Sequence, residues 1–129
     1  ALPRVMFVSG AKRANFEQII ASGVWPGVDF KKTVLLEADV PVGRSGRGGD
    51  ARLKSYTNTI IEIEVQSPDG GWLVLNDTWH PWWYAEIDGR PVEVHRANVI
   101  FRAVQVQAGR HTVRFEFRPV SGVLKGFLK

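Results

Sequence analysis

Two pairs of carboxylates have a spacing that could support acid–base chemistry. Glu62 and Glu64 lie two residues apart among alternating apolar residues. Glu86 and Asp88 repeat that spacing further along the chain. On a strand that rises ~3.3 Å per residue, each pair would stand about 7 Å apart, a separation that glycosidases use. Because both pairs alternate with apolar residues, we interpret them as the solvated face of a sheet, and Asp88 as a hairpin residue.

The histidines give no metal-binding pattern. His80, His95 and His111 form neither an HxH nor an HExxH motif, so the sequence predicts no metal site and no cofactor. The chain has no cysteine, which excludes disulfides, thiolate catalysis and cysteine-based zinc sites. His111 opens a strand after a turn, and we expect it to hydrogen-bond to a neighbouring backbone group.

A glycine-rich basic segment, residues 43–49, is similar to a phosphate-binding loop. It lacks the Gly-Lys-Ser/Thr ending and a following helix pattern, so a flexible, solvated loop is the simpler interpretation. If this loop has a partner, Arg44 and Arg47 favour an anion such as a lipid phosphate.

Aromatic residues cluster in residues 71–89, which hold four of the five tryptophans: Trp72, Trp79, Trp82 and Trp83. Such a cluster can be core, a sugar-stacking surface or an anchor at a membrane interface. Trp83 shares the parity of Ile87 in an alternating stretch, so we expect it in the core. Trp79 and Trp82 flank a proline at a corner between two strands and are the best candidates for exposure.

The composition is that of one globular domain. The 129 residues are 44% hydrophobic and 23% charged, which suits a folded core. The net charge of +4 permits contact with anionic head groups. No nucleic-acid-binding motif is present, so nucleic acid is not an expected partner. No window approaches the ~18 apolar residues of a membrane span.

The elements that must position these residues are mostly short strands. One short helix is predicted, because Asn15 can cap it, Gln18 follows three residues later and Gly23 can end it. The expected strands are residues 4–8, 33–38, 58–66, 72–77, 83–88, 91–95, 98–107 and 110–118. In the strand 98–107 the apolar parity slips near Arg102 and Ala103, which predicts a β-bulge.

This pattern predicts a mainly β fold: an antiparallel, jelly-roll-like β-sandwich with a small N-terminal α/β annex. We expect a single domain over residues 1–119. It divides into a strand–helix–strand annex (1–40), a flexible loop (41–51) and antiparallel hairpins (52–119), and residues 120–129 form a tail.

Residues 73–119 resemble the C-terminal extracytoplasmic domain of the YfhO family, bacterial multi-spanning membrane proteins of the C-type glycosyltransferase kind. The resemblance covers somewhat over a third of the chain closely and the N-terminal part loosely. The matching elements are Asn76-Asp77-Thr78, Trp79-His80, Pro81-Trp82-Trp83, Asp88-Gly89, Arg96-Ala97-Asn98, Phe101-Arg102-Ala103-Val104 and Ala108-Gly109-Arg110-His111. The family has Pro-Gly-Trp where this chain has Trp82 between Pro81 and Trp83. The turn is therefore built differently here, or an extra aromatic side chain projects outward.

The resemblance implies a domain on the outer face of the bacterial cytoplasmic membrane, tethered to the transmembrane part of its parent chain. The apolar tail 120–129, with its two lysines, is typical of the approach to a membrane span. In such proteins the catalytic acid lies in the transmembrane part, so the chain is not expected to be an enzyme by itself.

The resulting hypothesis is an accessory domain that helps to position a cell-envelope glycan or a lipid-linked sugar. Its contact residues would be Trp79, His80, Trp82 and Tyr84. Two alternatives stay open. A stand-alone carbohydrate-binding module would expose aromatic rings in one plane, whereas a structural or interaction domain without a ligand would bury every tryptophan.

Overall fold

The computed structural model describes residues 4–37 and 48–118. One helix, α1 (Phe16–Ser22), occurs in these residues. The strands are β1 (Val5–Val8), β2 (Gly10–Arg13), β3 (Thr33–Leu36), β4 (Asp50–Tyr56), β5 (Ile60–Ser67), β6 (Gly71–Leu75), β7 (Trp83–Ile87), β8 (Arg90–Val92), β9 (His95–Ala97), β10 (Phe101–Val106) and β11 (Gly109–Phe117). The fold is therefore mainly β, as predicted.

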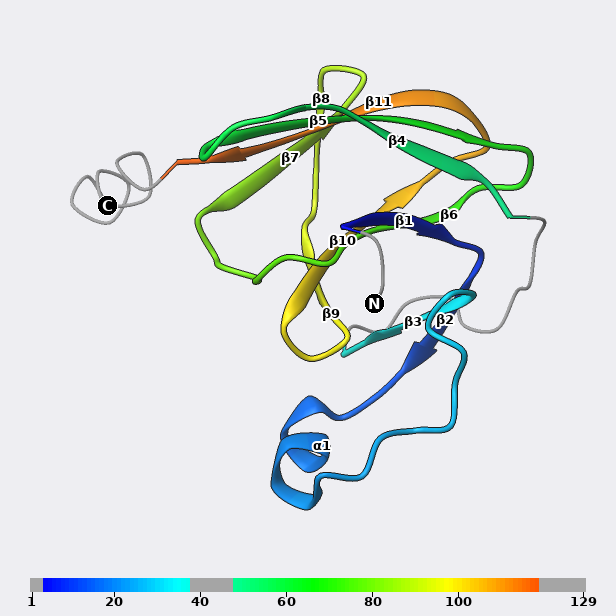
Figure 1. Cartoon of the computed structure of the whole chain (residues 1–129), viewed down its shortest axis with the longest axis vertical. Helices are drawn as coiled ribbons and strands as arrows, with labels where there is room; N and C mark the ends of the chain where they lie inside the picture. The colour runs from blue at the N-terminus through cyan, green and yellow to red at the C-terminus, as the bar shows by residue number, and fades with distance from the viewer. Residues whose placement is uncertain (1–3, 38–47, 119–129) are drawn as a thin grey trace.

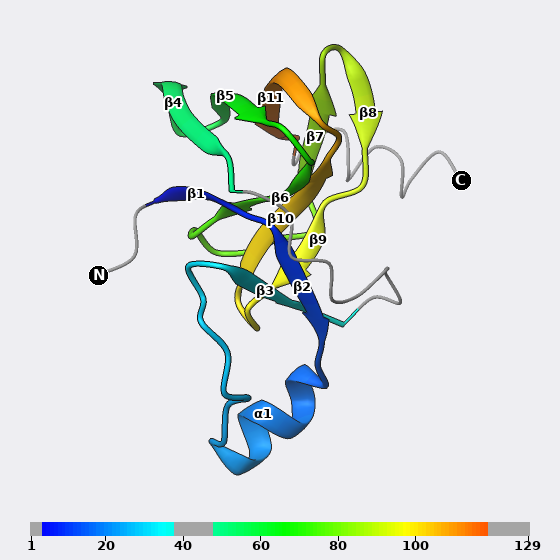
Figure 2. The same ribbon diagram turned by 90° about the vertical axis from the view of Figure 1, so that its right-hand side faces the viewer.

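The strands form two sheets that pack face to face as a sandwich (Figures 1 and 2). The six-stranded sheet has the order β1-β6-β10-β9-β3-β2, and the five-stranded sheet has the order β4-β5-β11-β7-β8. Nearly all neighbours are antiparallel, and β2 with β3 is the parallel pair among the described strands. The antiparallel sandwich expected from the hairpin spacing is confirmed.

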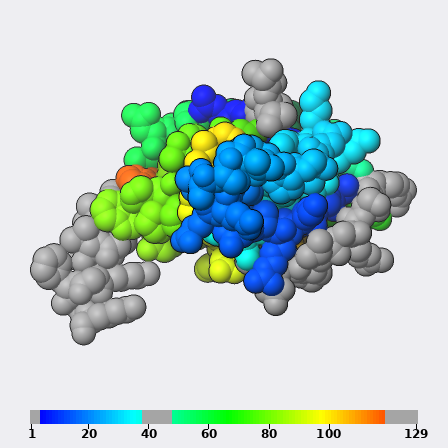
Figure 3. Space-filling model, turned by 90° about the horizontal axis from the view of Figure 1, so that it is seen from below, coloured from blue at the N-terminus to red at the C-terminus, as the bar shows by residue number. Residues whose placement is uncertain are grey.

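The parallel pair and α1 form a β–α–β unit at one edge of the six-stranded sheet. The side chain of Asn15 accepts a hydrogen bond from the backbone N–H of Gln18, and Gly23 ends the helix in the left-handed region with φ 69°. Both caps confirm the predicted helix ends. The buried Phe16 and Ile19 pack on Leu35, which fixes α1 beneath the sheet. Seen from below, α1 and the segment after it lie at the front (Figure 3).

The core lies between the sheets, where inward side chains of both interdigitate. Its fully buried members include Ile61, Ile63, Leu73 and Phe115. A second apolar cluster covers the other face of the six-stranded sheet and contains Trp72. Four consecutive residues of β6 are consequently buried, because this strand is covered on both faces.

β10 does not contain the predicted β-bulge. Its pairing with β6 runs without a shift from Arg102 opposite Leu75 to Val106 opposite Gly71. The parity is regular because Arg102, rather than an apolar residue, takes the inward position before Val104. The prediction failed because it placed Phe101 inward together with Val104 and Val106, whereas Arg102 takes that inward position.

The predicted strand 98–107 also begins too early. Asn98 and Val99 have positive φ values of 48° and 74° and form the turn between β9 and β10. The buried Asn98 side chain accepts a hydrogen bond from the Leu35 N–H at 2.8 Å. Asparagine tolerates this backbone region, and its bond to β3 holds the turn against the sheet.

The edges of the sheets differ from their interiors. β8 is three residues long and contains Pro91. β4 carries the exposed Arg52 and Lys54, and its pairing with β5 shifts between Leu53 and Ser55. β2 ends in two exposed cations, and β1 is short and mostly buried. Within the described residues, no helix is long and apolar enough to cross a membrane.

Candidate functional site

An aromatic corner lies where the segment between β6 and β7 meets the end of β11. We define it as His80, Trp82, Trp83 and Phe117. The rings of His80 and Trp82 meet edge to face at 4.9 Å between centroids, and His80 lies 5.6 Å from Phe117. Trp83 also packs on Phe117, with ring centroids 5.3 Å apart. His80 is exposed, and the two indoles are half-buried.

The turn at Trp82 is built without a glycine-like conformation. Among the described residues other than glycine, only Asp88, Asn98 and Val99 have positive φ. The Trp82 N–H instead donates to Nδ1 of His80 at 3.2 Å, and its carbonyl accepts from the Arg118 N–H at 3.0 Å. Both backbone groups of this tryptophan are satisfied, so the turn is held by His80 and by the end of β11.

Tyr84 lies on the opposite face of β7 from Trp83. The Arg118 guanidinium stands over the Tyr84 ring at 5.1 Å. The same guanidinium reaches the carboxylates of Glu116 at 3.1 Å and Glu86 at 3.8 Å. This part of the predicted site therefore combines an aromatic face with charged groups that can hydrogen-bond to a ligand.

Trp79 is held against the six-stranded sheet. Its backbone N–H donates to the carbonyl of Ile100, in the turn between β9 and β10, at 2.7 Å, and its side chain is half-buried. Of the four predicted contact residues, His80 and Trp82 touch each other, and Tyr84 is joined to Trp82 through Arg118. The structure gives no such direct connection for Trp79.

Arg102 is a buried cation that bridges the two sheets, and sequence analysis missed it. Its side chain is 1% exposed. The guanidinium stacks on the Trp83 ring at 3.9 Å and donates to the Thr78 carbonyl at 2.8 Å. Burial lowers the pKa of Arg102 to about 10, and the Asp77 carboxylate at 3.8 Å opposes that shift. Two of its guanidinium nitrogens, Nε and Nη2, have no hydrogen-bond partner.

Asp77 connects this buried cation to the surface. Its carboxylate accepts a hydrogen bond from the Tyr56 hydroxyl at 3.0 Å and lies 4.0 Å from the Arg4 guanidinium. The Arg4 guanidinium in turn covers the Tyr56 ring at 4.4 Å. The Asn-Asp-Thr element thus has a structural use here: it places a carboxylate and a carbonyl where Arg102 crosses the sandwich.

The carboxylate pairs lie on sheet surfaces, as expected. Glu64 is paired with Arg52 and Lys54 on the outer face of the five-stranded sheet. The hydrogen bond from Arg52 lowers the pKa of Glu64. A carboxylate kept ionised by two cations on an open sheet face is not arranged as a general acid.

Asp88, in the turn between β7 and β8, forms an ion pair with His111 on β11. Nδ1 of His111 lies 2.6 Å from the Asp88 carboxylate, and Nε2 lies 3.1 Å from the Ala108 carbonyl, which confirms the predicted backbone contact. The hydrogen bond that His111 donates to the Asp88 carboxylate raises the pKa of His111. The hydrogen bond from the Thr112 N–H lowers the pKa of Asp88, and the weaker effect of the hydrogen bond from His111 lowers it further.

This ion pair predicts a pH window for stability. His111→Gln should lower the free energy of unfolding most between the ordinary pKa of aspartate, 3.8, and that of histidine, 6.5. The Asp88 contribution is lost as pH falls through its lowered pKa, and the His111 contribution as pH rises through its raised pKa. Because both side chains are partly exposed, the difference should not exceed ~1 kcal/mol.

A urea-unfolding series across pH checks this window. Asp88→Asn is the matched variant, because asparagine tolerates the positive φ of 51° while the charge is removed. Both variants should show the same window. A stability difference that does not change with pH would contradict the assignment.

Trp25 is the tryptophan outside the cluster, and it is 48% exposed. Sequence analysis gave it no role, because it lies outside any alternating stretch. A signal was present, since a tryptophan between the helix-ending Gly23 and Pro26 belongs to no regular element that would bury it.

Arg44, Arg47 and the tail 120–129 lie outside the described residues. Within the described part of the chain, no group of three His, Cys, Asp or Glu side chains is placed to hold a metal ion. Comparison with known proteins found no matching family model, no matching curated protein and no matching solved structure.

Proposed function

We propose that this chain is a non-catalytic accessory domain of a membrane protein similar to the YfhO-type glycosyltransferases. In this proposal it stands on the outer face of the cytoplasmic membrane and holds a cell-envelope glycan or a lipid-linked sugar for the membrane-embedded part. The observation that carries it is the aromatic corner, where an exposed imidazole and a half-buried indole meet at 4.9 Å.

The chemistry of the corner supports a sugar ligand. The apolar face of a pyranose stacks on aromatic rings, while its hydroxyls need donors and acceptors at the ring edge. The rings are His80 and Trp82. The Arg118 N–H donates to the Trp82 carbonyl, and the Arg118 guanidinium lies with the Glu86 and Glu116 carboxylates on the Tyr84 face of β7. These rings pack on Phe117 and hence change little on binding, which limits the entropic cost.

The test is a titration of the chain with cell-envelope oligosaccharides and undecaprenyl-linked sugars in micelles, followed by tryptophan fluorescence. Trp82→Ala should weaken binding about tenfold, which corresponds to ~1.4 kcal/mol. His80→Ala should weaken it in the same direction. Leu53→Ala, which removes an exposed apolar side chain from β4, is the control and should bind like the wild type. Equal affinity of all four proteins would exclude the corner as the contact.

The proposal also expects membrane-spanning segments elsewhere in the same reading frame. A full-length translation of the gene checks this. A reading frame without such segments would favour the stand-alone carbohydrate-binding module, and binding of none of the sugars would favour a structural domain.

A further inference from the structure

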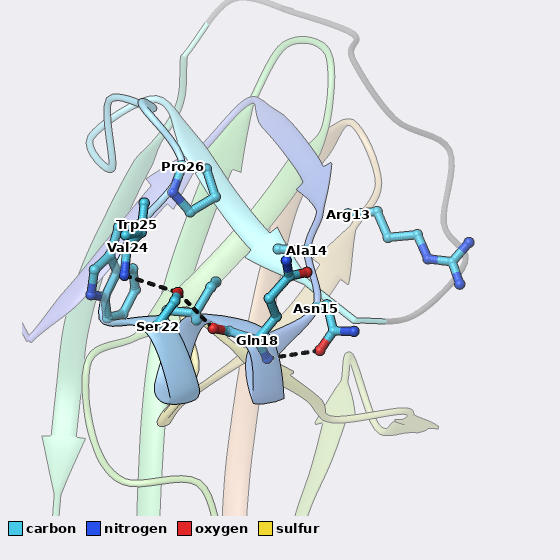
Figure 4. A pocket seen from close by; sticks show the side chains of 9 residues that line it. Arg13, Ala14, Asn15, Gln18, Ser22, Val24, Trp25 and Pro26 are labelled. Carbon is cyan, nitrogen blue, oxygen red and sulfur yellow. Dashed lines mark hydrogen bonds between the residues drawn. The ribbon is translucent and has the colours of Figure 1, made fainter.

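A pocket of about 300 Å³ lies between α1 and the segment that follows it (Figure 4). Its walls combine an aromatic and apolar side with a polar side. The side chains that matter to its chemistry are Asn15, Gln18, Ser22, Val24, Trp25 and Pro26. This pocket is formed by the β–α–β unit and shares no residue with the aromatic corner.

Trp25 gives the pocket an accessible aromatic surface that is held in place. Its ring meets Phe30 edge to face, with centroids 5.9 Å apart and an angle of 82°. Phe30 in turn packs against the buried cluster that contains Phe16 and Leu35. The indole is therefore supported from the core while 48% of the residue remains exposed. A supported indole loses little conformational freedom when a ligand stacks on it.

The polar side of the pocket is also positioned by the fold. The Gln18 N–H is bonded to Asn15 at 3.0 Å, and the Gln18 carbonyl accepts from the Ser22 hydroxyl at 2.7 Å. These bonds fix the main chain from which the Gln18 side chain rises toward Ala14, on the pocket side of α1 (Figure 4). A side-chain amide both donates and accepts, which is the pairing that a sugar hydroxyl requires.

The charges around the pocket favour a neutral ligand. An adjoining hollow of about 390 Å³ shares Arg13, Ala14 and Asn15 with the pocket and adds Glu17 and Glu37. One guanidinium beside two carboxylates does not make a phosphate site. The two hollows share three lining residues and therefore adjoin, so a ligand in the pocket can extend toward Glu17 and Glu37.

We infer that the pocket beside α1 is a second glycan site, separate from the aromatic corner. A neutral oligosaccharide stacks one ring on Trp25, hydrogen-bonds to the amides of Gln18 and Asn15, and continues toward Arg13. The inference goes beyond the proposed function, because it assigns binding to the N-terminal unit and not to the strands that carry the family resemblance.

The experiment is a ¹H–¹⁵N NMR titration of the 129-residue chain. The probes are the trisaccharides of N-acetylglucosamine and of glucose. We expect the indole N–H of Trp25 and the side-chain amide of Gln18 to shift. Trp25→Ala and Gln18→Ala should each weaken binding tenfold or more. Ile20→Ala is the matched control, since Ile20 is 63% exposed on the same helix and does not line the pocket.

The outcomes separate this site from the corner. Shifts at Trp25 that persist in Trp82→Ala support the inference. Binding that is lost in Trp82→Ala and retained in Trp25→Ala overturns it while supporting the proposed function. Shifts at neither site overturn the inference, and the titration with cell-envelope oligosaccharides and lipid-linked sugars then decides the proposed function. Concentration-dependent shifts at Ile20 and Val24 without sugar would show self-association at this face instead, and would also overturn it. The wild-type Trp25 signal decides the question even if a variant fails to fold.

Discussion

Arg102→Ala is expected to lower the free energy of unfolding by about 3 kcal/mol, within the range for large-to-small core substitutions. The change removes the stacking on Trp83 and leaves the Thr78 carbonyl without its donor. It also leaves a void between the sheets, because this side chain is among the largest that are fully buried. Urea unfolding followed by tryptophan fluorescence measures the effect. A loss below about 1 kcal/mol would contradict a bridging role for this residue.

Arg102→Met tests whether the Arg102 side chain stabilises the fold by filling space or by its charge. Burial lowers the pKa of Arg102 to about 10, so taking this guanidinium out of water has a cost that the Asp77 carboxylate does not fully offset. Methionine fills much of the same space without that cost, so this variant should differ from the wild type by no more than ~1 kcal/mol. If Met destabilised as strongly as Ala, the cation itself would be the stabilising element.

Gly71→Ala is expected to destabilise the protein by about 2 kcal/mol or more, as overpacked sites do. A Cβ at Gly71 would collide with the Val8 carbonyl of the neighbouring strand and would lie 2.8 Å from the Phe7 ring. β1 and β6 would have to separate, which would open both the inter-sheet core and the cluster around Trp72. For a chain of this size we expect the melting temperature to fall by roughly 6–10 °C.

Gly27→Ala is the control for this substitution. Among the described residues, and apart from its two chain neighbours, no atom lies within 4 Å of a Cβ placed at Gly27, and its φ is not in the left-handed region. Its stability should match that of the wild type within ~0.5 kcal/mol. Similar melting temperatures for the Gly71 and Gly27 variants would show that β1 is free to move away from β6.

Local patterns predicted most of the fold, because its hairpins and its helix carry their own signals. Asn15 and Gly23 marked the ends of α1, and strict alternation marked β5, β7 and β11. β2 was not predicted, since Gly10–Arg13 has no β-branched residue and becomes a strand only through its pairing with β3. The predicted bulge in β10 was wrong because it rested on an inward Phe101, and the inward residue is Arg102.

The candidate site was predictable in part. The expectation of a corner rested on Trp79 and Trp82, and both are half-buried. The packing of His80 on Phe117 is a contact between distant segments and leaves no trace in local sequence. The same holds for the pocket at Trp25, which forms only when the segment after α1 returns to the sheet to begin β3.

The differences between the sheet edges and their interiors bear on how the molecule behaves when it is concentrated. An edge strand that is long, flat and uncharged invites pairing with another copy and growth into aggregates. Here each edge resists that in its own way: β8 is three residues long and contains Pro91, a register shift and two cations interrupt β4, cations end β2, and β1 is short and mostly buried. At high concentration, copies of the chain should therefore not pair through the edges of their sheets.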